Sequence, residues 1–180
     1  QSNLEEEEEE PIKIEEEEEV EPVPEINPVI LSTKKKADEG NVISMFIYAN
    51  MMYNGEFIES DKKEAAKYYK KAADEGHEDS MVIYARMCSE ADGIEVNKKE
   101  AARYYRMASD EGDLNAMYAY AGILYRGDGI PMNKEEAANY YKIASLKGHV
   151  DSMIKYSLML DKGYGIKGDR REGARYCKMA

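Results

Sequence analysis

Glycine recurs at a fixed interval along this sequence, and that interval restricts the possible folds more than any other feature. The interval is 36 residues, and it separates Gly40, Gly76, Gly112 and Gly148. The segments that end at the last three glycines are also alike: KKEAAKYYKKAADEG at 62–76, KKEAARYYRMASDEG at 98–112 and KEEAANYYKIASLKG at 134–148. A shorter copy, RREGARYCKMA, follows at residues 170–180. Self-similarity at this period predicts an array of stacked structural repeats.

Each of these segments opens with the residues that start a helix. An Asp or Asn stands before the segment as a potential N-cap, and a Glu follows three residues later, in the position of a reciprocal capping box. The caps are Asp61, Asn97, Asn133 and Asp169, and the glutamates are Glu64, Glu100, Glu136 and Glu172. Good helix formers follow, without proline, until a glycine that can take the left-handed conformation. We therefore predict one helix here in each repeat, helix B.

A second helix, helix A, is predicted between each glycine and the next cap, over residues 41–53, 77–89, 113–125 and 149–161. Its residues recur at spacings of three and four, which places them on one face. That face repeats as Met45, Tyr48, Ala49; Met81, Tyr84, Ala85; Met117, Tyr120, Ala121; and Met153, Tyr156, Ser157. Against it we expect the alanines of helix B, with the tyrosine pairs 68–69, 104–105 and 140–141 filling the seam toward the next repeat. A helix pair cannot bury its own apolar face, so the repeats must stack.

The combined pattern resembles the Sel-one-like repeat (SLR) family. That family has small-xxx-Leu-Gly-xx-Tyr in helix A, a Gly-x-Gly-Val/Ile turn, and Lys-Ala-xx-Trp-Tyr-x-Lys-Ala-Ala-xx-Gly in helix B. The turn is represented by Gly127-Asp128-Gly129-Ile130, and Tyr replaces the usual Trp at 68, 104 and 140. The resemblance covers residues 41–180. It implies an all-α fold, a right-handed α/α solenoid of about four repeats related to tetratricopeptide arrays.

These observations divide the chain into three parts. Residues 1–28 are predicted to be a disordered Glu-rich acidic tail, and residues 29–40 a junction or degenerate capping helix. Residues 41–180 form the predicted solenoid, with repeats at 41–76, 77–112, 113–148 and 149–180.

The acidity of the chain belongs to its tail. Of the net charge of −12, residues 1–25 account for thirteen Glu and one Lys, and the remaining 155 residues hold 24 acidic and 24 basic side chains. Clustered glutamates together with Pro11, Pro22 and Pro24 predict disorder. The tail is interpreted as a solvated linker or, alternatively, as a docking segment for a basic partner. A basic stripe of the kind that binds phosphates is absent, so a nucleic-acid role is not supported.

Two cysteines, Cys88 and Cys177, lack the spacing of a disulfide framework or a zinc site and are expected to be buried in a reducing compartment. No apolar run reaches the ~18 residues of a membrane span, and no signal peptide is recognisable. We expect a cytoplasmic or nuclear protein without membrane insertion, metal or cofactor. The resemblance includes adaptors of membrane-protein degradation at the endoplasmic reticulum, so that organelle stays open.

The expected function is that of a scaffold or adaptor that binds other proteins. The resemblance implies that helix A residues off the packing face line a concave, partner-binding surface. The candidates are Phe46, Ile47, Asn50, Tyr53, Val82, Arg86, Tyr118, Tyr125, Ile154 and Lys155. Four of them stand at equivalent positions and predict an apolar stripe: Phe46, Val82, Tyr118 and Ile154. Asn50 and Arg86 can form hydrogen bonds with a peptide backbone or a carboxylate. The alternative for each residue is a place in the core, since apolar stripes at helical spacing commonly pack inside.

A catalytic role is not expected. His77 and His149 stand at equivalent positions before helix A, which indicates cap chemistry, and no phosphate loop or nucleophile elbow occurs. Two alternatives remain. The array could be the regulatory arm of a larger, possibly catalytic protein, or a β-lactamase-like enzyme of the cysteine-rich branch of the family. That branch has regularly spaced disulfide pairs, which Cys88 and Cys177 do not reproduce. The sequence leaves the partner, the pathway and the oligomeric state open.

Overall fold

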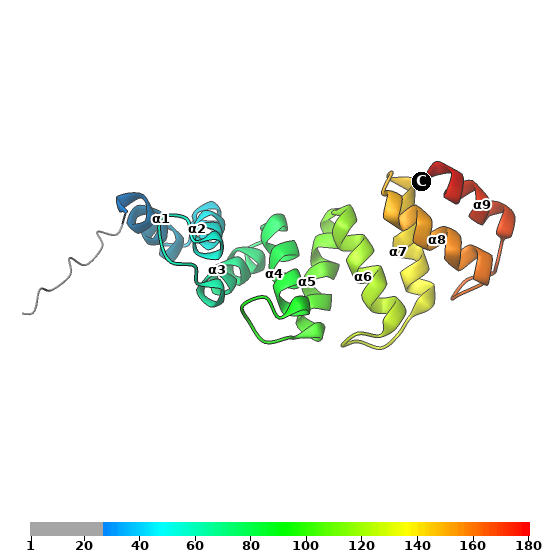
Figure 1. Ribbon diagram of the computed structural model, residues 1–180, viewed down its shortest axis with the longest axis horizontal. Helices are drawn as coiled ribbons and strands as arrows, with labels where there is room; N and C mark the ends of the chain where they lie inside the picture. Colours follow the sequence, from blue (N-terminus) through cyan, green and yellow to red (C-terminus); the bar gives the residue numbers. More distant parts are fainter. Residues whose placement is uncertain (1–26) are drawn as a thin grey trace, which may run out of the picture.

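Helices follow one another along the whole part of the chain that the computed structural model describes, residues 27–180, and none of these residues forms a strand. The elements are α1 (Pro28–Asp38), α2 (Val42–Asn54), α3 (Lys62–Asp74), α4 (Glu78–Glu90), α5 (Lys98–Glu111), α6 (Leu114–Arg126), α7 (Lys134–Leu146), α8 (Val150–Lys162) and α9 (Arg170–Met179). Figure 1 shows them stacked in chain order from α1 to α9. The predicted all-α solenoid is confirmed, with four A–B pairs from α2 to α9. The predicted tail, up to residue 26, lies outside the described residues.

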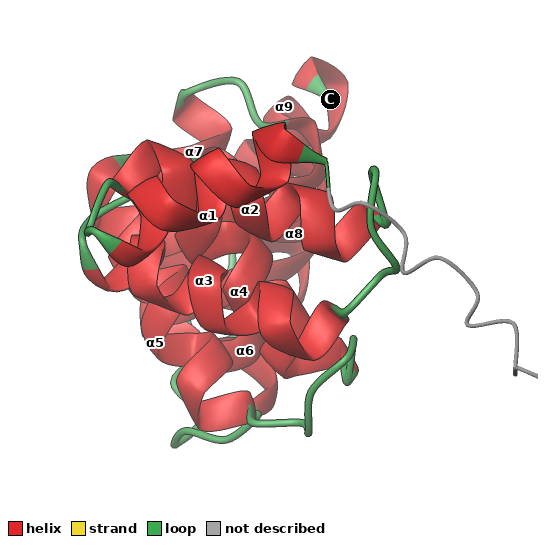
Figure 2. Ribbon diagram, turned by 90° about the vertical axis from the view of Figure 1, so that its left-hand side faces the viewer, coloured by secondary structure: helices red, strands yellow, loops and turns green. Residues whose placement is uncertain are grey.

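The helices form two layers. In the view along the array (Figure 2), the odd-numbered helices α1 to α7 lie to one side of their even-numbered neighbours. Each helix makes its extensive contacts with the helices just before and after it in the sequence. An array of this kind is held together by nearest-neighbour interfaces, so each repeat depends on the next for a covered apolar face.

The predicted caps are confirmed, but half of the capping box is wrong. Asp61 Oδ1 accepts from the Glu64 backbone N–H at 2.9 Å, and Asn133 Oδ1 accepts from that of Glu136 at 3.1 Å. The reciprocal bond does not form, because the backbone N–H of each cap already has a partner in helix A. Asp61 N–H donates to the Met52 carbonyl at 2.9 Å, and Asn133 N–H to the Leu124 carbonyl at 2.9 Å. The cap residue therefore also fastens helix B to helix A of the same repeat.

The core follows the predicted faces. The Met, Tyr and small residues of helix A are buried, as are the alanines of helix B. Helix A and helix B of each repeat are joined by an edge-to-face tyrosine pair, with ring centroids 4.7 to 5.1 Å apart, in the pairs Tyr48–Tyr68, Tyr84–Tyr104, Tyr120–Tyr140 and Tyr156–Tyr176. Edge-to-face contacts of this kind add about 1 kcal/mol each to area burial.

The two tyrosines of each helix B pair point in different directions, and the sequence prediction holds for only one of them. The first tyrosine reaches back toward the preceding repeat: Tyr68 OH donates to Asp38 at 2.6 Å and Tyr104 OH to Asp74 at 2.5 Å. The hydrogen bond from Tyr68 lowers the pKa of Asp38. The second tyrosine lies beneath helix A of its own repeat, as Tyr69 does when it donates to Asn50 Oδ1 at 2.6 Å. The seam prediction is therefore wrong for the first tyrosine of each pair, because a helix turns each successive residue by about 100° and sends neighbours to different faces. It holds for Tyr105 and Tyr141, which line one groove together with residues of the next repeat.

The turn glycines bring adjacent repeats into close contact. A Cβ atom on Gly129, where φ is +75°, would lie 2.7 Å from the backbone at the start of α5, in the preceding repeat. Gly93 and Gly165 have the same relation to the first residues of α3 and α7. In the first repeat Phe57 occupies this position at φ +62°. Phe57 has room for a side chain because α1 begins at Pro28, the position equivalent to Glu64. The first two residues of the later B helices, which the other turns approach, therefore have no helical equivalent in α1.

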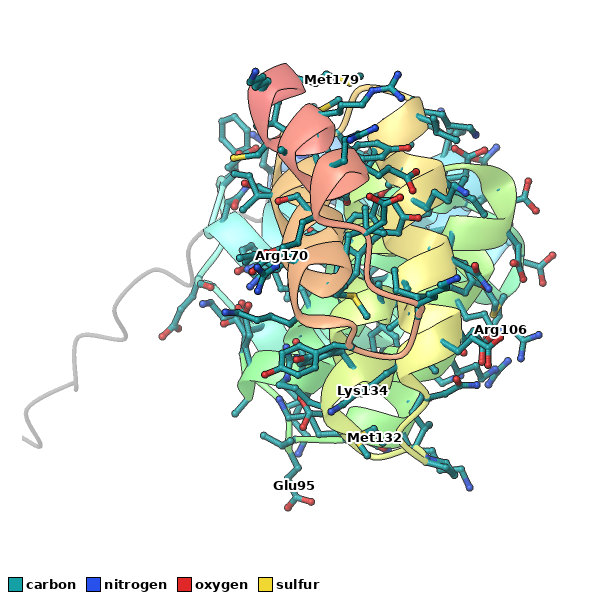
Figure 3. All side chains as sticks on the ribbon, turned by 90° about the vertical axis from the view of Figure 1, so that its right-hand side faces the viewer. Glu95, Arg106, Met132, Lys134, Arg170 and Met179 are labelled. Carbon is teal, nitrogen blue, oxygen red and sulfur yellow. The ribbon has the colours of Figure 1, made fainter. Side chains whose placement is uncertain are left out.

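The C-terminal end of the array leaves some apolar residues uncovered. Cys88 is buried as predicted, but Cys177 is exposed, and both are free thiols. Cys177 is equivalent to the buried second tyrosines of the other repeats, but within residues 27–180 no helix packs over this face of α9. Figure 3 shows this end, with Met179 at the outer edge of α9 and Arg170 at its start. Met179 is 61% exposed.

Candidate partner-binding groove

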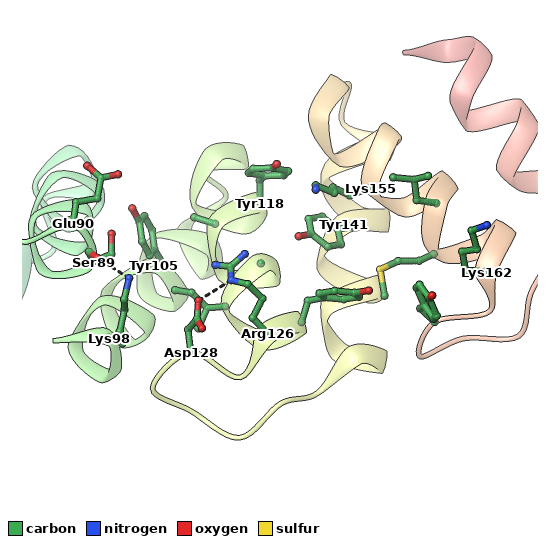
Figure 4. Close-up of a pocket in the computed structure, with 17 residues that line it drawn as sticks. Ser89, Glu90, Lys98, Tyr105, Tyr118, Arg126, Asp128, Tyr141, Lys155 and Lys162 are labelled. Carbon is green, nitrogen blue, oxygen red and sulfur yellow. Dashed lines mark hydrogen bonds and ion pairs between the residues drawn. The ribbon is translucent and has the colours of Figure 1, made fainter. Parts of the chain in front are cut away.

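A groove of about 630 Å³ opens on the helix A layer of the second to fourth repeats. We call it the central groove. It is lined by Ser89, Glu90, Lys98, Tyr105, Tyr118, Ala119, Gly122, Ile123, Tyr125, Arg126, Asp128, Tyr141, Lys155, Leu158, Met159, Lys162 and Tyr164. Figure 4 shows Tyr105, Tyr118 and Tyr141 between the ribbons, with Lys98 and Lys162 at opposite ends. Grooves of this size with aromatic walls and a few polar groups are typical of peptide and ligand sites.

A glycine forms the floor of the groove. Gly122 is buried in the middle of α6, where Asn50, Arg86 and Leu158 stand in the other repeats. A Cβ at this position would meet Tyr141 OH at 3.5 Å and the end of the Arg126 side chain at 3.2 Å. Glycine inside a helix costs about 1 kcal/mol relative to alanine. Gly122 therefore lowers the stability of α6, and it leaves the floor of the groove free of a side chain.

Tyrosine rings supply the apolar walls. Tyr118 lies half-buried between Tyr141, with ring centroids 5.7 Å apart, and His149, at 5.4 Å. Burial raises the pKa of the Tyr141 hydroxyl to about 12. That hydroxyl therefore stays protonated and can donate a hydrogen bond at any physiological pH. The rings offer flat apolar surface, and the hydroxyls offer donors beside it, which suits an extended peptide.

Positive charge exceeds negative charge in the groove. Its cations are Lys98, Arg126, Lys155 and Lys162, and its carboxylates are Glu90 and Asp128. Arg126 is paired with Asp128 at 2.7 Å, and Lys162 lies 3.6 Å from Asp161 at the rim. Lys98 donates to the Ser89 carbonyl at 2.6 Å, a neutral partner. Within residues 27–180 no ion pair involves Lys155, so Lys98 and Lys155 keep charge that an anionic ligand could neutralise.

Only part of the predicted binding surface lines this groove. Tyr118, Tyr125 and Lys155 do. Tyr53 and Arg86 instead belong to a polar network between the first two repeats. Tyr53 OH donates to Asp92 Oδ2 at 2.5 Å, and Lys62 Nζ donates to Asp92 Oδ1 at 2.6 Å. Arg86 lies 3.8 Å from the same carboxylate. These bonds lower the pKa of Asp92, and they occupy the groups that were expected to meet a partner.

The other five candidates also lie outside the groove lining. Phe46 stacks on His77, with ring centroids 4.5 Å apart, and Asn50 holds the Tyr69 hydroxyl. Val82 is half-buried at the edge of the core. Ile47 and Ile154 are exposed, at 41% and 43%. The expected apolar stripe is thus uneven: Phe46 and Tyr118 are packed against the next repeat, whereas Ile154 lies on α8, the last helix A among residues 27–180.

Several groove residues were missed from the sequence. The sequence pattern places Tyr105 and Tyr141 in the seam between repeats, and it does not single out Lys98, Arg126 or Lys162. Some of these residues can be recognised from the sequence. The second tyrosine recurs every 36 residues, and Gly122 is the one equivalent position of helix A that has no side chain. The lysines gave no signal, because only the stacking of α5 against α6 and of α8 against α7 brings them to one opening.

The two histidines cap helices, as predicted. His77 Nδ1 accepts from the Ser80 backbone N–H at 3.2 Å, and His149 Nδ1 accepts from that of Ser152 at 3.2 Å. Among the described residues there is no group of three or more His, Cys, Asp or Glu side chains placed to hold a metal ion. The same residues include no helix with the length and apolar character of a membrane span.

Comparison with known proteins now identifies the repeat. The Sel1 repeat model matches residues 42–77, 79–113, 114–149 and 150–180. A protective antigen of uropathogenic Escherichia coli with an SLR fold superposes with a TM-score of 0.76 at 24% identity, over 82% of this chain and 32% of that one. A Sel1 repeat protein from Oxalobacter formigenes gives 0.72 at 25% identity, over 83% and 60%. The chain therefore spans about a third and about three-fifths of their lengths.

A more distant structural relative is the cysteine-rich protein B of Helicobacter pylori. It superposes with a TM-score of 0.52 at 15% identity, over 69% of this chain and 92% of that one. At this identity the likeness concerns the fold alone. No curated protein sequence matches the chain.

Proposed function

This chain belongs to the Sel1 repeat family, whose members generally act as protein-interaction scaffolds, and from this we propose that it is an adaptor that holds an extended segment of a partner protein in the central groove. The observation that supports the proposal is the groove itself: tyrosine walls, donor hydroxyls and lysines come from four successive helices and converge on an opening whose floor is a glycine. An extended peptide laid across successive helices would meet each of these groups in turn.

The chemistry of the groove favours binding over catalysis. Its polar groups are hydroxyls, cations and two carboxylates, and Asp128 is already paired with Arg126. A general acid or base needs a titratable group within hydrogen-bond reach of the reacting atom and a pKa near the working pH. The groove offers instead protonated donors on rigid rings, which position a ligand.

Gly122→Asn tests the proposal with little risk to the fold. Asn is the residue at the equivalent position of the first repeat, where Asn50 accepts from Tyr69 OH. The new amide would fill the groove floor and accept from Tyr141 OH in the same way, while removing a mid-helix glycine. We expect the variant to be at least as stable as the parent, because only the flexible Arg126 side chain must move.

The readout is selection of peptides of about 12 residues, a length that spans several helices when extended, from a displayed library on the full chain. Peptides that bind the parent should be lost on Gly122→Asn and on Tyr118→Ala. They should be retained on Arg106→Ala, an exposed residue of helix α5 outside the groove lining. Retention on Gly122→Asn would refute the assignment of the groove.

A further inference from the structure

We propose that the resident occupant of the central groove is the chain's own Glu-rich segment, residues 5–19, which a partner must displace. The proposal rests on the proposed function of the groove and adds the chemistry of its ligand and a means of regulation. It commits to an acidic peptide with interspersed aliphatic residues, supplied by the same chain.

The distribution of charge is the first argument. Residues 26–180 contain as many basic as acidic side chains, so the excess of cations in the groove is a local property of this face. Among residues 27–180, Lys98 and Lys155 in particular form no ion pair. The only long run of like charge in the sequence is the acidic one, with Glu5–Glu10 and Glu15–Glu19. Carboxylates on such lysines would replace water by charge-assisted hydrogen bonds.

The pattern of apolar residues is the second argument. Between and beside the glutamate runs stand Ile12, Ile14 and Val20. In an extended peptide alternate side chains point to opposite sides, so Ile12 and Ile14 can face the rings of Tyr118 and Tyr141 together. The flanking glutamates then lie toward the ends of the groove, where Lys98 and Lys162 stand (Figure 4).

The tether is the third argument. From Asn27 back to Glu10 an extended chain reaches on the order of 55 Å, and neighbouring helices of a layer are about 10 Å apart, so two repeats can be crossed. A tether of this length gives an effective concentration on the order of 1 mM. An intrinsic Kd of about 0.1 mM would then leave the groove roughly 90% occupied, and a competing peptide would bind about tenfold more weakly than to an empty groove.

Competition measured on the full chain tests this. The probe is a fluorescent synthetic peptide that reproduces residues 4–22, and its anisotropy is followed at low salt. The key variant replaces Glu5–Glu10 and Glu15–Glu19 by Gln, which removes the charge of the tethered segment and leaves the array unchanged. We expect this variant to bind the probe about tenfold more tightly than the parent, and salt to weaken the binding.

A second pair of variants locates the binding. Lys98→Gln with Lys155→Gln, added to the Gln-tail variant, should weaken probe binding about tenfold. The control, Lys36→Gln with Lys142→Gln, changes charge equally on exposed helix residues away from the groove and should leave it unchanged. Circular dichroism confirms that each variant is folded.

Each contrary result has a separate meaning. Equal probe affinity for the parent and the Gln-tail variant, with loss on the groove lysine variant, would overturn self-occupancy and leave the proposed function standing. If the probe affinity is unchanged by Lys98→Gln with Lys155→Gln, or if the probe binds to no variant, the proposal that the groove takes an acidic peptide is overturned. The library selection on Gly122→Asn is independent of both.

Discussion

Replacing Gly129 by alanine should weaken the interface between the second and third repeats. At φ +75° the added methyl group strains the backbone by about 1 kcal/mol, partly offset by the lower entropy of the unfolded chain. The larger effect is contact, because the Cβ would lie 2.7 Å from the Lys98 carbonyl carbon and from the Lys99 nitrogen. Backbone atoms of a capped helix cannot move aside as a side chain can. Overpacking of this kind costs about 1–3 kcal/mol, so we expect a total of about 2–4 kcal/mol.

Gly148→Ala is the matched control. Its φ of +95° is also left-handed, but no atom lies within 4 Å of the added Cβ. The strain is comparable and the contact is absent, so we expect a loss of about 1 kcal/mol or less.

Urea unfolding followed by helical circular dichroism measures both variants, and the slope of the transition shows whether the array still unfolds cooperatively. If the two variants lose stability equally, within about 0.5 kcal/mol, the close approach of the repeats does not have the energetic role assigned to it.

Three further predictions concern single contacts. Ala91 has a φ of +60° at a position where the other repeats have glycine, so Ala91→Gly should relieve backbone strain and stabilise the fold by about 0.5–1 kcal/mol. The variant should have a higher melting temperature, and a lower one would contradict the strain. Asn133→Ala should lose about 1 kcal/mol in urea unfolding by removing the cap of α7, and no loss would mean that the cap is dispensable. Asp92 has a lowered folded pKa because it accepts from Lys62 and Tyr53, so its stabilisation is present above the unfolded pKa of 3.8 and is lost as pH falls through the lower folded value. Asp92→Asn should therefore flatten the fall in urea midpoint below about pH 4, and an unchanged profile would contradict this.

The sequence alone determined the architecture of this protein. Caps such as Asp61 and Asn133, the terminating glycines and the buried face of helix A are set by interactions within a few residues, and each appears in four copies. Local rules applied to repeated segments therefore predicted the helices and their core. They failed where a local group had a distant partner: the N–H of Asp61 bonds to Met52 in helix A, and Tyr68 reaches back to Asp38.

The candidate groove, in contrast, was decided by the tertiary structure. A groove is the space left between side chains of different repeats, so it depends on what each neighbour supplies. Gly122 leaves the groove floor without a side chain, and Tyr141 comes from the other helix layer. Lys98 and Lys155 line the same groove only because α5 and α8 stack on either side of α6 and α7. Arg86, predicted from the sequence to contact a partner, lies between Tyr53 and Asp92 and outside the groove lining. Helix periodicity assigns a residue to a face, and only the packing of the repeats determines whether that face is open.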